Sequence, residues 1–140
     1  MGELAEQAVA RLVAERNVTL RALLGLAESD CARPVEWSGR SQSVGRMLRT
    51  FTSHSLDHFQ HLHRLLQARG RTMTEAQLLL MKAEAAQAEF TALLRSLTDS
   101  EFTQAGPKEG DWSAAQILDH VTDNERKYRE AILAALGRTE

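Results

Sequence analysis

The sequence has few cysteines, prolines and aromatic residues, and it has no long apolar run. Cys31 is the only cysteine among 140 residues, so no disulfide can form within the chain and a reducing cytoplasm fits. Only two prolines, Pro34 and Pro107, interrupt the chain, which suits long helices. There is neither a signal-peptide core nor an apolar run of about 18 residues. We therefore expect a soluble, unprocessed protein without a membrane span.

The charge distribution of the chain gives it neither a strongly basic nor a strongly acidic surface. Seventeen Lys and Arg residues are interspersed with nineteen Asp and Glu residues, for a net charge of -2, so we expect binding to neither nucleic acid nor anionic membrane. Arg64, Arg69 and Arg71 form a small basic patch, which we interpret as a solvated helix end rather than a phosphate site. With 43% apolar residues, residues 1–140 are enough for one domain with its own core.

Apolar residues recur at helical spacing in four long stretches. Thr74 with Gln77 and Ser113 with Gln116 make capping boxes that open the third and fourth helices, and a glycine follows the second and the fourth. No segment alternates apolar and polar residues long enough to predict a sheet. The pattern predicts an all-α four-helix bundle, with helices at about 3–28, 43–68, 74–97 and 113–136.

The two halves of the chain resemble each other. EWSGRSQSVGRML in the first half corresponds to DWSAAQIL in the second, and a shift of 70 residues aligns Ser43 with Ser113. The same shift places His54 opposite Asn124. We expect a pseudo-twofold bundle in which Trp37 and Trp112 each open a helix and pack at a bundle end, rather than stack on a ligand.

Four of the five histidines lie in one stretch, FTSHSLDHFQHLHRLL. Helical phase predicts that His54 and His58 face the core, that His61 lies at its edge and that His63 faces solvent. Histidines at positions i and i+4 can bind one cation, but the pattern fits hydrogen-bonded core or cleft histidines equally well. His120, the remaining histidine, falls at the edge of the fourth apolar stripe.

Two motifs resemble those of the DinB/YfiT-like superfamily. WSAAQILDHVTDNERKYREAIL is similar to that family's tryptophan-serine helix, in which a histidine follows the tryptophan by eight residues and a glutamate comes five later; SHSLDHFQHL is similar to its H-x-x-x-H motif with an acidic residue before the second histidine. The order of the two motifs is reversed here relative to most members. A pseudo-twofold bundle accommodates either order because each helix keeps an equivalent place.

The resemblance implies a divalent metal, nickel or zinc, with iron or manganese as alternatives. The family's three histidine ligands carry over to His54, His58 and His120. Such a site leaves coordination positions open, and the family resemblance implies either metal-dependent hydrolysis or transfer of a small thiol, such as bacillithiol or mycothiol, to an electrophile. Glu125 and Asn124 are candidates for catalysis or substrate contact.

Several side chains near these motifs also have simpler interpretations. The carboxylates of Asp57, Asp123 and Glu125 fit proton transfer, but each also fits a solvated helix face. Cys31 lies near Arg33 without a histidine close in sequence, so we interpret it as an incidental thiol. The alternative to an enzyme is a non-catalytic bundle that binds metal structurally or binds another protein. Apolar helix surface also suffices for a homodimer.

Overall fold

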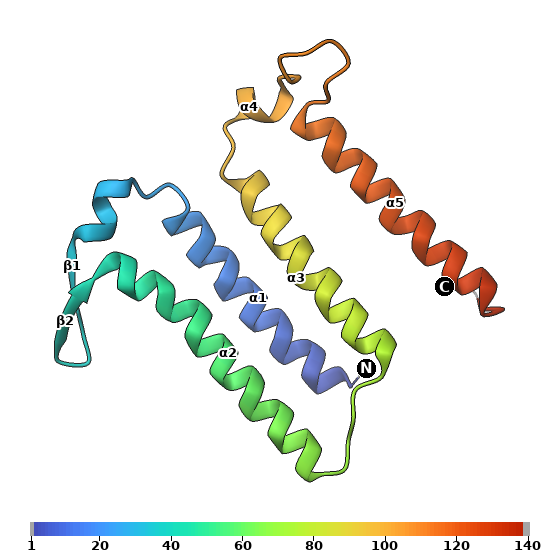
Figure 1. Cartoon of the computed structure of the whole chain (residues 1–140), viewed down its shortest axis with the longest axis horizontal. Helices are drawn as coiled ribbons and strands as arrows, with labels where there is room; N and C mark the ends of the chain where they lie inside the picture. The colour runs from blue at the N-terminus through green and yellow to red at the C-terminus, as the bar shows by residue number, and fades with distance from the viewer. Residues whose placement is uncertain (1, 139–140) are drawn as a thin grey trace. The chain divides into compact units, whose positions relative to one another are not determined.

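The computed structural model describes residues 2–138, which are mostly helical with one small hairpin (Figure 1). The chain divides into two compact units, Met1–Ala88 and Glu89–Glu140. A single domain over residues 1–140 stays a prediction. In chain order the elements are α1 (Glu3–Leu23), the 3-10 helix η1 (Glu28–Ala32), β1 (Pro34–Trp37), β2 (Arg40–Ser43), α2 (Val44–Ala68), α3 (Glu75–Arg95), α4 (Asp99–Thr103) and α5 (Ala114–Ala135).

The predicted helix starts are confirmed by their capping bonds. Before α3, the Gln77 backbone N–H donates to Thr74 Oγ1 at 3.2 Å, and the Thr74 N–H donates to Gln77 Oε1 at 3.0 Å. The same reciprocal pair joins Ser113 and Gln116 before α5, at 3.2 and 2.9 Å. Each box satisfies backbone donors that the first helical turn leaves without a partner.

The predicted glycine stops are confirmed as well. Gly70 after α2 and Gly137 after α5 have φ values of 69° and 64°, and these left-handed positions favour glycine. The N–H of Arg71 donates to Leu66 O at 3.0 Å, and that of Arg138 to Leu133 O at 2.9 Å, so both helices end in the same type of turn. Local structure therefore repeats between the halves.

The expectation that the chain contains no β-structure is wrong between α1 and α2. Strands β1 and β2 pair antiparallel, from Pro34 opposite Ser43 to Trp37 opposite Arg40. Ser38 and Gly39 connect them with φ values of 50° and 72°, as in the two-residue turns that match strand twist. Each strand has four residues, too few to show alternation. Trp37 thus lies in β1 instead of opening a helix.

In the first unit, the hairpin and η1 lie against the start of α2. The Val44 N–H donates to Arg33 O at 2.9 Å, and a Cβ added to Gly45 would lie 3.2 Å from the Cys31 carbonyl oxygen. The Arg16 guanidinium of α1 lies over the Phe51 ring of α2, 5.6 Å from its centroid. Glycine at position 45 therefore allows the close approach of η1.

In the second unit, α4 contacts α5, and Ala105 forms an isolated antiparallel bridge with Ser113. Among residues 2–138, Ser113 is the only buried side chain and no apolar one is buried. The packing of four apolar stripes into one bundle therefore stays a prediction.

Within residues 2–138, no helix is long and apolar enough to cross a membrane. Half-buried apolar residues include Leu20, Leu23, Val35, Met47 and Leu48 in the first unit, and Phe90, Leu94, Leu97, Phe102 and Leu118 in the second.

Candidate functional site

Two of the predicted ligands, His54 and His58, face each other on α2. Their spacing of four residues stacks them one helical turn apart, and the two Nε2 atoms are 3.1 Å apart. The rings meet edge to face, with centroids 4.5 Å apart and planes 79° apart. Both side chains are exposed, so the prediction that they face a core is not seen among the described residues. The two ring nitrogens nevertheless converge on one point.

This separation fits two ligands of one metal ion. Zinc binds imidazole nitrogen at about 2.0–2.1 Å with tetrahedral angles, which places two ligand nitrogens about 3.3 Å apart. The observed 3.1 Å differs from that by a few tenths of an ångström. As long as no ion binds, one Nε2–H donates to the other Nε2, because a pair of neutral imidazoles can share one hydrogen bond.

The other two histidines of α2 lie apart from this pair. His61 is exposed, and its ring is 6.4 Å from that of His58 at 29° between the planes, so its nitrogens do not join the pair. His63 is half-buried, with its ring 6.3 Å from that of Phe59. His63 is therefore less exposed than the predicted position facing mainly solvent.

The third predicted ligand, His120 of α5, is held by two neighbours. Asn124 Nδ2 lies 2.8 Å from His120 Nε2, one helical turn away. The Trp112 ring, just before α5, meets the His120 ring edge to face, with centroids 5.0 Å apart and planes 63° apart. Asn124 is half-buried and His120 exposed.

The Trp112 contact was missed in the sequence, where packing at a bundle end was expected. Trp112 is 51% exposed, and its one described ring contact is with His120. The spacing of eight residues between Trp112 and His120 is the signal that could have revealed it, because Ser113 caps the helix and the preceding residue can fold back over the first turns.

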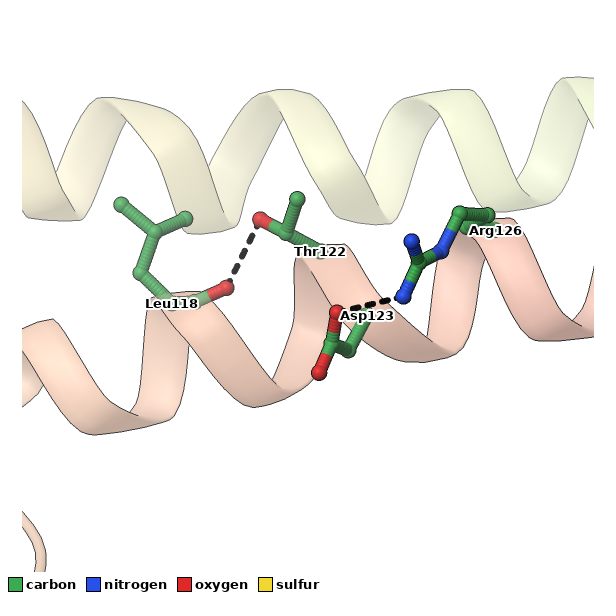
Figure 2. Close-up of polar contacts among 4 residues, drawn as sticks. All are labelled: Leu118, Thr122, Asp123 and Arg126. Atoms are coloured by element: carbon green, nitrogen blue, oxygen red, sulfur yellow. Dashed lines mark hydrogen bonds and ion pairs between the residues drawn. The ribbon is translucent and has the colours of Figure 1, made fainter.

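The candidate carboxylates differ in their surroundings. Asp123 Oδ1 pairs with Arg126 at 3.0 Å (Figure 2), with both side chains more than half exposed. Thr122 on the same helix donates to the Leu118 carbonyl at 2.8 Å (Figure 2). Asp57 and Glu125 are exposed. An exposed pair contributes little to stability, so Asp123 fits a solvated helix face, whereas Glu125 keeps its carboxylate available.

The structure thus brings His54 together with His58, and His120 together with Asn124, within separate units. In neither unit do the described residues bring three His, Cys, Asp or Glu side chains together around one possible ion position. Cys31 is half-buried in η1 as a free thiol. The complete set of His54, His58 and His120 stays a prediction.

Comparison with protein families supports the motif that contains Trp112, His120 and Glu125. The family model of the DinB superfamily matches residues 82–139. The matched part is less than half of the chain; it contains Trp112, His120 and Glu125 but not the H-x-x-x-H pair of α2. Neither the curated proteins nor the solved structures gave a match.

Proposed function

We propose that this chain binds a divalent metal ion through His54, His58 and His120, because the DinB superfamily model matches residues 82–139. The proposal extends to catalysis: hydrolysis of a small molecule, or transfer of a low-molecular-weight thiol to an electrophile. The observation that carries it is the pair of Nε2 atoms 3.1 Å apart on α2. Nickel and zinc are the first candidates, since both accept imidazole ligands.

Different residues of the chain would serve as metal ligands and as the proton-transfer group. His54 and His58 supply two nitrogens in fixed register, because both sit on the same face of one helix. His120 supplies a third from α5. An ion held by three neutral imidazoles keeps its full charge and open positions, and so polarises a carbonyl or acidifies a water or thiol. The exposed carboxylate of Glu125 is the candidate for moving a proton at the site.

Metal content of single variants tests the ligand set. The untagged protein is stripped with a chelator, loaded with zinc or nickel, desalted and analysed by mass spectrometry. We expect about one ion per chain, and a lower content in His54→Ala, His58→Ala and His120→Ala. Losing even an indirect partner of a metal ligand costs about 10–100-fold in affinity, so losing a ligand should cost at least that.

His61→Ala is the matched control, because His61 lies on the same helix without joining the pair. Its metal content should equal that of the wild type. A wild-type content far below one ion, or the same content in all four variants, would contradict the proposal.

A thermal shift separates catalytic from structural metal. The zinc-loaded protein is heated with and without cysteine as a probe thiol, and the metal-free protein serves as control. A ligand at 100 times its Kd stabilises a protein by about 2.7 kcal/mol. If the metal has an open position, cysteine should therefore raise the melting temperature of the zinc-loaded protein but not that of the metal-free protein. No shift, with metal content intact, favours the non-catalytic alternative.

A further inference from the structure

The contact between Asn124 and His120 restricts the chemistry of the imidazole. The side-chain atom of Asn124 nearest to the ring is Nδ2, 2.8 Å from His120 Nε2. An amide nitrogen can only donate a hydrogen bond, so Nε2 must accept it with its lone pair. The proton of the neutral ring is then on Nδ1, because the hydrogen bond at one nitrogen sets the state of the other.

We infer that Asn124 is a positioning residue for His120, which it holds in the Nδ1–H tautomer. The surroundings agree with this role. Asn124 is half-buried whereas His120 is exposed, so the more constrained partner orients the freer one. The edge contact with Trp112 restricts the ring on a second side. A half-turn of the ring about the Cβ–Cγ bond would put Cε1 in the place of Nε2 and break the hydrogen bond with Asn124.

The histidine pair of α2 lacks such a directing group in its described contacts. His54 Nε2 and His58 Nε2 share one hydrogen bond with each other, and either ring can be the donor. Their tautomers depend on one another, whereas that of His120 depends on Asn124. The tautomers of the three histidines are therefore set by different contacts.

The consequence for metal binding rests on the proposed function. A metal ion binds the unprotonated nitrogen of a neutral imidazole. The Nδ1–H tautomer assigns that role at His120 to Nε2, the atom that the Asn124 amide engages in the metal-free protein. Asn124 thus keeps Nε2 unprotonated in the metal-free protein, and a metal ion that binds Nε2 would take the place of this hydrogen bond. Asn124 itself is not a catalytic residue.

Nitrogen NMR of the full-length, chelator-treated protein, labelled with ¹⁵N-histidine, tests the inference. Spectra are recorded at a pH where the rings are neutral, and His120 is assigned by the signals missing from His120→Ala. We expect Nδ1 to have the shift of a protonated nitrogen and Nε2 that of an unprotonated one. Asn124→Ala should move both shifts toward an average of the two tautomers.

A second variant and a control keep the test decisive. Asn124→Asp has the same shape but only accepts hydrogen bonds, so it should reverse the assignment and put the proton on Nε2. Thr122→Ala removes a hydroxyl that donates to the Leu118 carbonyl and should leave the His120 shifts unchanged. A protonated Nε2 in the wild type, or an unchanged tautomer in both Asn124 variants, would overturn the inference.

The two hypotheses fail separately. If Nδ1 carries the proton and Asn124 controls it, the inference holds even when His120→Ala leaves the zinc content unchanged, and then only the proposed metal site is lost. If zinc binding depends on His120 but the wild-type Nε2 is protonated in the metal-free protein, the positioning role is lost and the metal site remains.

Discussion

Gly106 offers a sharp test of how the segment before α5 is built. A Cβ at this position would lie 2.5 Å from Asp111 Oδ2, 2.6 Å from Asp111 Cβ and 2.9 Å from Asp111 Cγ, against an ordinary contact distance of 3.4–4 Å. The Oδ2 atom could move away by side-chain rotation, but Cβ is fixed to the backbone. Gly106→Ala must therefore displace the backbone of this loop.

The displacement has two costs. Overpacking of this kind costs about 1–3 kcal/mol. It also strains the bond in which the Lys108 N–H donates to Asp111 Oδ2 at 2.9 Å, and such a bond contributes about 0.5–1.5 kcal/mol. Because Gly106 is only half-buried and the loop can adjust, we expect a loss in the lower part of the combined range of about 1.5–4.5 kcal/mol, about 2 kcal/mol. With a urea m-value of about 2 kcal/mol/M, the midpoint should fall by about 1 M.

Urea unfolding followed by far-ultraviolet circular dichroism measures this loss. The matched control is Gly25→Ala, where an added Cβ meets nothing within 4 Å and φ is not left-handed. That change should be neutral or stabilising by up to about 1 kcal/mol. In the double variant with Asp111→Gly, the obstructing atoms are gone, so the loss should be smaller than the sum of the single losses. Equal stability of the two alanine variants, or simple additivity, would refute the reasoning.

Two further predictions concern helix caps. Ser113→Ala should destabilise the chain by about 1–2 kcal/mol in urea unfolding, because Ser113 is 5% exposed and its Oγ accepts the Gln116 N–H; a loss no larger than that of the exposed Thr122→Ala would contradict it. Hydrogen bonds from the Thr98 backbone N–H, then from its hydroxyl, hold the pKa of Glu101 below its ordinary value of 4.5. This cap therefore stabilises α4 above pH 4.5 and is lost as the pH falls through the lowered pKa; a carboxyl NMR titration with a midpoint at or above 4.5, or one unchanged in Thr98→Ala, would disprove it.

The caps and helix stops could be predicted from sequence because they are local. Thr74 with Gln77, and Ser113 with Gln116, sit within one helical turn, so their spacing alone fixes which backbone donors they satisfy. The β1–β2 hairpin was missed because its strands are too short for periodicity to register. The Ser38-Gly39 turn was the available signal, and it competes with many similar loop dipeptides.

For the histidines of α2, the sequence likewise predicted the local pairing but not the surroundings of each ring. The pairing of His54 with His58 follows from one helical turn, and the structure confirms that their nitrogens approach each other. The partial burial of His63 and the position of its ring beside that of Phe59 could not be deduced from phase, since phase gives a direction and not the rotamers of neighbouring side chains.

The sequence by itself determined the starts of α2, α3 and α5, their caps and the approach of His54 to His58, because each depends on residues at most a few positions apart along the chain. Tertiary structure decided the fit of Gly45 against the Cys31 carbonyl and the contact of Arg16 with Phe51. These involve residues far apart in the chain, and their approach depends on loop geometry that no local pattern encodes. Whether His120 completes the site with His54 and His58 is a question of the same long-range kind, and metal content of the single variants answers it directly.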